Sequence, residues 1–305
     1  MKTDLIWMDG NLIPTEEARI PFLTPSLHYG VSIFEGLRCY QTAQGPAVFR
    51  LDAHMQRFLD SAHIIGIRAF PYTLEDLRQA IFATIRANDL QECYIRPLMY
   101  LDGPLGLKLD QAQPRVGIAV WPWDTYHGAE ALEQGLRMTV SSFTRLHPNI
   151  NMTKAKVSGN YVNSMLAKTD ALRMGFDEVI MLDPDGYVAE SSGMNLFMVR
   201  DEQIYTPARA TILEGITRDA VVTLIDDLGY SLIEEPISRD QLYIADEIFL
   251  CGTAAEVVAV REIDFRQIGA GRMGPVTKSV QATFFRTVRG EGARSAEWLE
   301  YLPSP

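Results

Sequence analysis

Hydrophobic positions at helical spacing mark two helices in the first third of the chain. Within residues 53–66, apolar side chains recur every three or four positions, which gives a helix one apolar face. Residues 73–88 repeat this pattern, and they begin with Thr73 followed three positions later by Asp76. That arrangement is close to a capping box, in which side chain and backbone at a helix start bond each other. We therefore predict amphipathic helices over both ranges.

Alternating apolar and polar positions predict strands around these helices. Residues 5–12 place Asp9-Gly10-Asn11 between apolar neighbours, the pattern of a tight hairpin. Residues 92–101 also alternate, which puts Tyr94 and Arg96 on the same face of a strand. Residues 115–121 form a further apolar strand. The first part of the chain is therefore predicted to mix strands and helices.

A break in the pattern follows Trp121. Pro and Gly interrupt the periodicity over residues 121–128, which makes this stretch the best candidate domain boundary. We predict a smaller N-terminal α/β domain over 1–121, a linker over 122–131 and a larger C-terminal domain over 132–305. The second half mixes both element types: strands near 137–142, 178–182, 195–199, 246–250 and 256–262, and helices at 160–174, 217–228 and 276–288.

Composition and charge narrow the possible classes of protein. The 305 residues suggest roughly two domains, and 47% hydrophobic with 22% charged residues favour a folded core. The net charge of −11 and the lack of a Lys/Arg run argue against a nucleic-acid partner. No apolar run approaches the roughly 18 residues of a membrane span, and the N-terminus lacks a signal-like apolar region. Three widely spaced cysteines form no disulfide framework, so we expect a cytoplasmic protein.

Two short segments supply the residue types that pyridoxal phosphate chemistry requires. Lys156 and Tyr161 lie in Lys-Val-Ser-Gly-Asn-Tyr, and Glu190 opens Glu-Ser-Ser-Gly-Met-Asn. In such enzymes a lysine forms a Schiff base with the cofactor, a carboxylate keeps the pyridine nitrogen protonated and a phenol bonds the ring oxygen. Lys154 lies two positions from Lys156, and strand alternation would place both on one face. Spacing therefore leaves open which lysine is the reactive one.

A phosphate site is predicted at the start of a helix. Gly215-Ile216-Thr217 precedes the helix at 217–228, whose free backbone amides and positive end attract anions. Gly252-Thr253-Ala254 follows a strand, and its small residues let backbone amides approach a ligand closely. Arg57 lies off the apolar face of its helix, so it is either a surface charge or a bidentate phosphate ligand.

Other chemistries lack their signatures. Gly269-Ala270-Gly271-Arg272-Met273-Gly274 fits G-x-G-x-x-G, but only 31 residues follow it, too few for the βαβ unit of a dinucleotide site. We predict a turn before the last helix there. The chain has no G-x-S-x-G segment of a Ser-His-Asp hydrolase, and its five histidines have no metal-ligand spacing, so no metal is expected.

With these motifs in order, the chain resembles the branched-chain amino acid aminotransferases, which are fold-type IV pyridoxal phosphate enzymes. The resemblance runs nearly end to end, through the blocks 28–40, 54–57, 94–97, 121–123, 156–161, 190–197, 215–220 and 252–256. It implies a mixed α/β fold of two domains with the cofactor in the cleft between them.

The resemblance also implies a role for each matching residue. It places the Schiff base and the proton carrier on Lys156, the ring oxygen contact on Tyr161 and the ring nitrogen contact on Glu190. The residues implied to hold the phosphate are Arg57, Ile216, Thr217 and Thr253. Tyr94, with the amides of Thr253 and Ala254, is implied to bind the substrate α-carboxylate, and Arg96 the side-chain carboxylate of glutamate. Further residues implied to contact substrate are Phe34, Gly36, Arg38, Trp123, Tyr126, Tyr161 and, from a neighbouring subunit, Tyr29.

The implied activity is a ping-pong transfer of the amino group of L-leucine, L-isoleucine or L-valine to 2-oxoglutarate. The expected partners are amino acids, 2-oxo acids and a second copy of the chain, in a homodimer or a larger assembly. The same scaffold carries D-amino acid aminotransferases, R-selective amine transaminases and aminodeoxychorismate lyases, and fold alone does not choose among them. The segments 35–38 and 94–96 favour the branched-chain activity, while the loop 101–109 matches less well and leaves the donor range open. A non-catalytic cofactor-binding protein would lack the lysine–tyrosine–carboxylate set.

Overall fold

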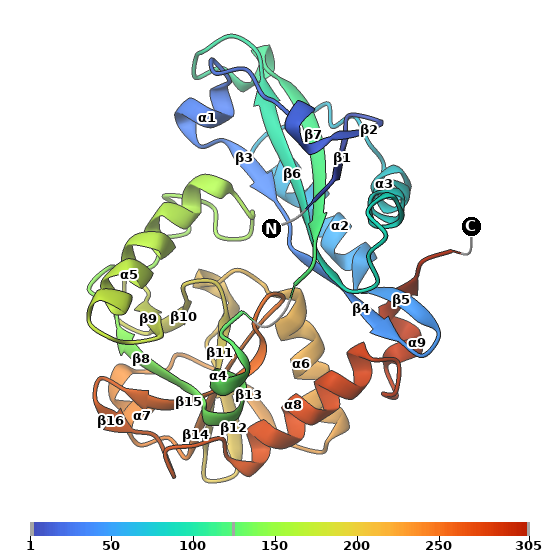
Figure 1. The fold of residues 1–305 in the computed structure, drawn as a ribbon. Helices are drawn as coiled ribbons and strands as arrows, with labels where there is room; N and C mark the ends of the chain where they lie inside the picture. The colour runs from blue at the N-terminus through green and yellow to red at the C-terminus, as the bar shows by residue number, and fades with distance from the viewer. Residues whose placement is uncertain (1–2, 124–125, 304–305) are drawn as a thin grey trace. The chain divides into compact units, whose positions relative to one another are not determined.

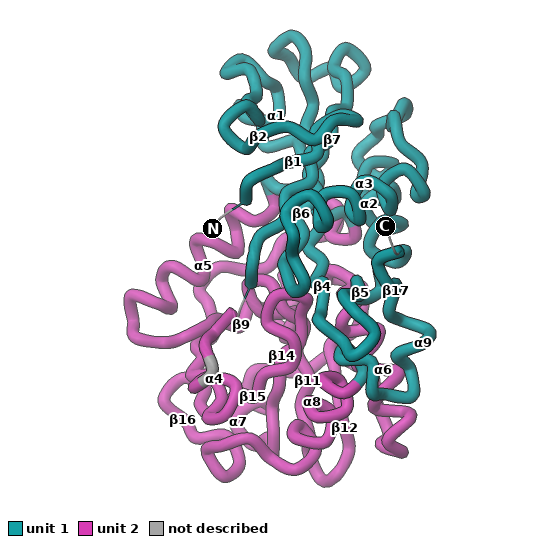
Figure 2. Tube along the Cα trace, turned by 45° about the vertical axis from the view of Figure 1, so that its right-hand side comes forward, with its two compact units in different colours: residues 1–124, 155–159, 287–305 teal, residues 125–154, 160–286 magenta. Residues whose placement is uncertain are grey.

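The computed structural model describes residues 3–123 and 126–303, which form two compact units (Figures 1 and 2). The first unit comprises residues 1–124, 155–159 and 287–305, and the second comprises 125–154 and 160–286. The change from one unit to the other at 124–125 falls within the predicted linker. The units differ from the predicted domains because 155–159 and 287–305 group with the first unit. Strand pairing between distant segments, which no local pattern reveals, holds the chain end there.

The described part of the first unit is built on a mainly antiparallel eight-stranded sheet. Its order is β17-β5-β4-β6-β7-β1-β2, with β3 also paired to β6. The strands are β1 (Leu5–Met8), β2 (Asn11–Pro14), β3 (Ser32–Phe34), β4 (Leu37–Thr42), β5 (Gly45–Phe49), β6 (Cys93–Asp102), β7 (Gln113–Trp121) and β17 (Leu299–Tyr301). The helices are α1 (Pro25–Tyr29), α2 (Leu51–Ile64), α3 (Leu74–Ala87) and α9 (Ser295–Trp298).

Helices α2 and α3 confirm the two predicted amphipathic helices. Their apolar residues, such as Met55 and Ile81, are fully buried in one cluster with the core-facing side of β6. The predicted capping box is present: the hydroxyl of Thr73 accepts from the amide of Asp76 at 3.2 Å, and the Asp76 carboxylate accepts from the amide of Thr73 at 2.8 Å. The hairpin β1–β2 turns at Asp9 and Gly10, which take φ angles of 46° and 97°. Such positive angles are typical of tight hairpin turns.

The second unit contains a mixed sheet that is nine-stranded over the described residues. Its order is β10-β9-β8-β15-β14-β11-β12-β13, with β16 paired to β15. The strands are β8 (Leu136–Val140), β9 (Glu178–Leu182), β10 (Val188–Ser191), β11 (Asn195–Arg200), β12 (Gln203–Thr206), β13 (Leu232–Glu234), β14 (Glu247–Gly252), β15 (Glu256–Ile263) and β16 (Arg266–Gln267). The helices are α4 (Ala129–Gln134), α5 (Tyr161–Arg173), α6 (Ile216–Asp227), α7 (Arg239–Tyr243) and α8 (Pro275–Val288).

The elements predicted for the second half are confirmed with small shifts at their ends. Residues 269–274 form turns and bends before α8, as predicted, and not a dinucleotide loop. The start of α8 is capped by the buried carboxylate of Glu247, which accepts from the amides of Val276 and Thr277 at 3.0 and 2.7 Å. The strands β4, β5, β12 and β13 were not predicted. The predicted mixed α/β class is confirmed. None of the described helices combines the length and apolar character needed to cross a bilayer.

Candidate active site

In the first unit, aromatic rings lie on the face of β6 that points away from the core. We refer to Tyr94, Trp121 and Trp123 as the aromatic wall. The ring of Tyr94 lies 5.1 Å from that of Trp121 and 4.9 Å from that of Trp123. The register of β6 with β7 pairs Tyr94 with Trp121, so the sheet itself brings these rings together. Arg96, two positions on, donates to the Tyr94 hydroxyl at 3.1 Å and lies 4.7 Å above the ring of Phe34. An apolar surface beside a cation suits a ligand that is both apolar and anionic.

Nε of Arg96 and Nε1 of Trp121 are buried donors without a hydrogen-bond partner among the described residues. A buried polar group without a partner is costly, and such groups often mark the place where a ligand or a water binds. Trp121 was quoted in a sequence motif but not predicted as a site residue. Its position at the end of β7, opposite Tyr94, is visible only once the strands are paired.

Lys156 lies in the same unit as this wall. Its Nζ is 4.8 Å from the centroid of the Phe34 ring. Its backbone is held from both sides, because its carbonyl accepts from the amide of Phe34 at 3.1 Å and its amide donates to the hydroxyl of Ser61 at 3.0 Å. The lysine, the aromatic wall and Arg96 are thus brought together by β3, β6 and α2.

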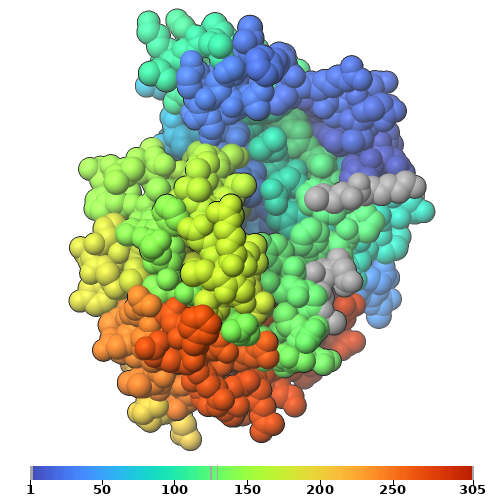
Figure 3. Space-filling model, turned by 60° about the vertical axis from the view of Figure 1, so that its left-hand side comes forward, coloured from blue at the N-terminus to red at the C-terminus, as the bar shows by residue number. Residues whose placement is uncertain are grey.

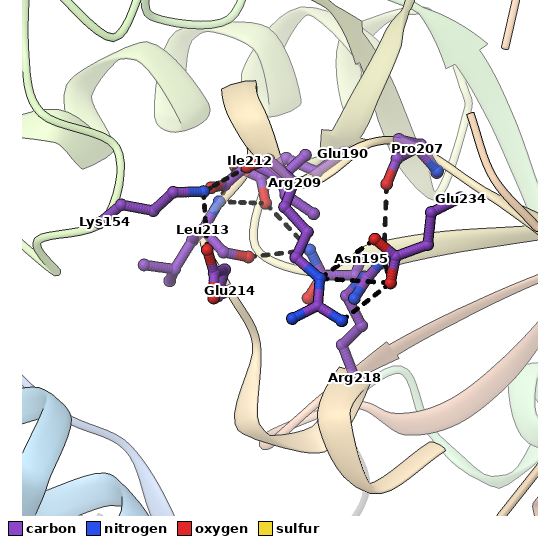
Figure 4. A network of polar contacts seen from close by, with 10 residues as sticks. All are labelled: Lys154, Glu190, Asn195, Pro207, Arg209, Ile212, Leu213, Glu214, Arg218 and Glu234. Carbon is purple, nitrogen blue, oxygen red and sulfur yellow. Dashed lines mark hydrogen bonds and ion pairs between the residues drawn. The ribbon is translucent and has the colours of Figure 1, made fainter. Parts of the chain in front are cut away.

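Lys154 has a different environment, in the second unit. Its Nζ donates to the backbone carbonyls of Arg209 and Ile212, and it forms an ion pair with Glu214 at 3.2 Å (Figure 4). The expectation of strand alternation here is wrong, since residues 153–154 form a turn. Lys154 is therefore bonded to the loop 209–214, whereas Lys156 lies beside Phe34.

Glu190 is a buried carboxylate whose orientation is fixed by several donors. It lies on β10, is 4% exposed, and accepts from Nε of Arg145 at 2.7 Å. Asn195 of β11 donates to its second oxygen at 3.3 Å, and the amide of Leu213 approaches both oxygens at 3.3–3.4 Å (Figure 4). Arg145 was missed from the sequence because it lies in an irregular segment with no motif, 45 positions away from Glu190.

The N-terminus of α6 lies on the segment that also contacts Glu190. Its N-cap is Gly215, which has no side chain to cap the helix. The first amides of a helix have no intrahelical partner, and this N-cap leaves them available to an anion. The hydroxyls of Thr217 and Thr253 lie 3.5 Å apart, from α6 and from the turn after β14. Gly215 leaves room for Asn195, because a Cβ at position 215 would overlap Oδ1 of that side chain. One short segment, 213–217, thus joins the carboxylate site to the predicted phosphate site.

Arg57 forms a bidentate ion pair inside the first unit, with Glu35. The Glu35 oxygens accept from Nε at 2.6 Å and from Nη2 at 2.8 Å, and His54 Nδ1 donates to Oε2 at 2.8 Å. Burial alone would raise the pKa of the Glu35 carboxyl, but Arg57 and His54 together hold that pKa well below its ordinary value. Burial and the charges of Arg57 and Lys156 lower the pKa of His54, despite Glu35. The imidazole donates to Glu35 through Nδ1, and its buried Nε2 has no partner among the described residues.

The other predicted site residues are found in several environments. Arg38 is 3% exposed, ion-paired to Glu92 at 3.2 Å and stacked on Tyr40, so the structure gives it a structural partner. Tyr126 lies in the second unit, where its hydroxyl accepts from Lys168 at 3.0 Å. The remaining residues are placed as follows: Tyr29 is the exposed last residue of α1, Tyr161 and Ile216 are the first residues of α5 and α6, and Ala254 is in the turn after β14. Their roles stay predictions.

Comparison with known proteins identifies the family. Residues 32–263 match the model of the family described as amino-transferase class IV. The branched-chain-amino-acid aminotransferase of Pseudomonas aeruginosa is 48% identical over 96% of each chain, and that of Escherichia coli K12 is 44% identical over 99% of this chain and 98% of its own.

Solved structures agree with this assignment. The T.th. branched-chain amino acid aminotransferase with pyridoxamine 5′-phosphate superposes with a TM-score of 0.96, at 46% identity, over 99% of this chain and 100% of that one. Further structures of the same T.th. enzyme contain N-(5′-phosphopyridoxyl)-L-glutamate or 4-methylvaleric acid. The resemblance stated from the sequence, the two-domain fold and the enzyme class are confirmed, and the chain belongs to the class IV aminotransferase family.

Proposed function

We propose that the protein moves the amino group of L-leucine, L-isoleucine or L-valine to 2-oxoglutarate. The observation that carries the proposal is the wall formed by Tyr94, Trp121 and Trp123 with Arg96 at its edge, beside Lys156 and Phe34. Aromatic rings suit an aliphatic side chain, and Arg96 suits the second carboxylate of glutamate. Family membership supports transamination as the reaction.

Membership of the family confirms the expected cofactor, pyridoxal 5′-phosphate. When bound, this cofactor supplies an electron sink for charge that develops at the substrate α carbon. Glu190 would meet its ring nitrogen, Tyr161 its ring oxygen, and Arg57, Ile216, Thr217 and Thr253 its phosphate. The uncapped start of α6 and the fixed, buried carboxylate of Glu190 fit these two roles. Lys156 would bind the aldehyde and, once released, carry the proton to and from the α carbon.

The two ligands named for the T.th. enzyme support the substrate assignment. One is a phosphopyridoxyl derivative of L-glutamate, the other a carboxylic acid with the carbon skeleton of leucine. A single pocket that accepts both needs an apolar surface and a cation at its edge. Tyr94 with the amides of Thr253 and Ala254 would bind the α-carboxylate that all these substrates share.

A half-reaction tests the proposal most directly. The purified, cofactor-loaded protein is mixed with L-leucine alone and its absorption spectrum is recorded. We expect the visible band of the lysine-bound cofactor to disappear while the band of pyridoxamine phosphate rises. A spectrum that ignores L-leucine but responds to D-alanine or an R-amine would assign the protein to another activity on the same fold.

Gly36→Ala is expected to lower kcat/KM for L-leucine by about 10-fold or more, as a misplaced positioning group can. A Cβ on Gly36 would overlap the Tyr94 hydroxyl and lie 2.8 Å from its Cζ. The Tyr94 ring cannot move away easily, because it is packed against Trp121 and Trp123. Gly117→Ala is the matched control: it lies on β7 of the same sheet, and the nearest atom to its Cβ is 3.9 Å away. Equal kinetics for the two variants would show that Tyr94 is not a substrate contact.

We also infer a homodimer. Exposed apolar side chains support it in both units: Phe22 (75%) and Leu27 (56%) around α1, and Val162 (58%) and Met165 (68%) on α5, whose surface Figure 3 shows in yellow-green. Tyr29, at the end of α1, would contact substrate in the second subunit. Light scattering should give a mass of twice 34.2 kDa, and Leu27→Glu should reduce it. A monomeric wild-type protein would contradict the proposal.

We also infer a cytoplasmic location. It is supported by the three cysteines, none of which forms a disulfide.

A further inference from the structure

A buried carboxylate in the first unit holds the arginine that is proposed to bind the cofactor phosphate. Glu35 follows β3 directly and has an exposed fraction of 0%. Each of its oxygens accepts one bond from the guanidinium of Arg57, at 2.6 and 2.8 Å. Burying a carboxylate is unfavourable unless its charge is paired and its oxygens are bonded. A carboxylate in such a place therefore needs a reason beyond packing.

His54 completes the set from the same helix as Arg57. The two residues are three positions apart on α2, so both side chains reach the same side of the helix. His54 is 1% exposed, and its Nδ1 donates to Oε2 of Glu35 at 2.8 Å. The amide of Gly36 also approaches Oε2, at 3.3 Å. The carboxylate cannot rotate without losing several of these bonds at once. We refer to Glu35, His54 and Arg57 as the arginine clamp.

The clamp fixes the direction of the guanidinium before any ligand arrives. An arginine side chain is long and loses much rotamer freedom when it binds an anion. Phosphate recognition depends on the direction of the planar N–H fork, so a wrongly turned guanidinium loses a bidentate contact. Glu35 bonds Nε and Nη2, which defines the orientation of the whole plane. Ordering that precedes binding removes this entropy cost from the binding step.

We propose that Glu35 and His54 are positioning residues that orient Arg57 for the phosphate of the cofactor and thereby set its affinity. The inference rests on the proposed function, since it takes Arg57 as a phosphate ligand. This role differs from that of an ion pair that only stabilises the fold. Loss of the clamp should weaken the affinity only for ligands that carry a phosphate, whereas loss of a structural ion pair should weaken the affinity for every ligand of the site equally.

The test compares pyridoxal phosphate with pyridoxal, which has the same aldehyde but no phosphate. The full chain, stripped of cofactor, is titrated with each compound, and the absorbance of the lysine-bound chromophore gives two dissociation constants. We expect Glu35→Gln to weaken pyridoxal phosphate binding by about 10- to 100-fold, the range known for residues that orient a ligating side chain. Pyridoxal should bind as in the wild type. The ratio of the dissociation constant for pyridoxal to that for pyridoxal phosphate therefore isolates the phosphate contact, and this ratio falls when the contact is lost.

Three further variants make the result specific. Glu300→Gln is the matched control, because this carboxylate also contacts α2, through the amide of Asp52 at 3.0 Å, but lies outside the clamp. His54→Asn keeps a donor near the position of Nδ1 and should retain the ratio, whereas His54→Leu removes the donor and should lower it. On an Arg57→Met background, Glu35→Gln should cause no additional change in the ratio, because its effect passes through the arginine.

The outcomes separate this inference from the proposed function. A wild-type ratio in Glu35→Gln, or an equal loss for both ligands, would overturn the clamp while leaving the transaminase intact. If Glu35→Gln does not fold, the His54→Asn and His54→Leu pair decides in the same way. A wild-type protein that binds neither compound would instead refute the proposed function, and the clamp with it.

Discussion

Lys156→Ala is expected to reduce turnover of L-leucine with 2-oxoglutarate by at least about 10⁴-fold, the upper range for losing a positioned proton carrier. The variant loses both the nucleophile for the cofactor aldehyde and the base at the substrate α carbon. We do not expect Lys154 to take over the role of Lys156, because Lys154 is bonded to carbonyls of the loop 209–214 in the second unit. A coupled assay of glutamate formation measures the loss.

Lys154→Ala is the natural control for this variant. It removes the neighbouring amine and an exposed ion pair with Glu214, which contributes only about 0–1 kcal/mol to stability. We expect most of the activity to remain. Adding a small primary amine to Lys156→Ala should restore part of the rate, since a free base can then reach the α carbon. Full activity in Lys156→Ala, or its loss in Lys154→Ala alone, would move the catalytic role to Lys154.

Glu190→Gln is expected to lower kcat for L-leucine by about 10²- to 10³-fold, as the loss of one preorganised electrostatic contact does in other enzymes. The amide keeps the size of the side chain but removes the negative charge that would face the ring nitrogen. It also leaves Arg145 without its carboxylate in a buried place, which costs about 3–5 kcal/mol when one partner of a buried pair is removed. Kinetics and thermal unfolding should therefore both be measured, with the cofactor content read from absorbance.

The matched control for Glu190→Gln is Glu262→Gln. Glu262 lies on β15 of the same sheet and is also paired with an arginine, Arg137, at 2.8 Å, but its side chain is 27% exposed. We expect this variant to keep its kcat and to lose little stability, because screening weakens an exposed pair. An unchanged kcat in a folded, cofactor-loaded Glu190→Gln would show that the carboxylate does not act on the ring.

Much of the local structure could be predicted from the chain alone. Helices α2, α3, α5, α6 and α8 are long enough for their 3.6-residue period to be visible, and the capping box at Thr73 marks one start within a residue. The longer strands, such as β6, have a clear two-residue period, which correctly placed Tyr94 and Arg96 on one face. Short strands and the pairing of the chain end through β17 could not be predicted, because they depend on partners far along the chain.

Some features of the candidate site could likewise be predicted from the sequence, and others were decided only by the tertiary structure. Resemblance to the family indicated Lys156, Glu190, Thr217 and Arg57, whereas spacing alone left the choice between Lys154 and Lys156 open. Tertiary structure alone decided which charges pair: Arg57 with Glu35 across 22 positions, and Arg145 with Glu190 across 45. The tertiary structure also showed that the two lysines have different environments: Lys154 binds the loop 209–214, and Lys156 lies over the ring of Phe34. The periodicity of apolar residues is a local property and can be read from a short window of the sequence. A buried ion pair instead exists only where folding removes both charges from water together.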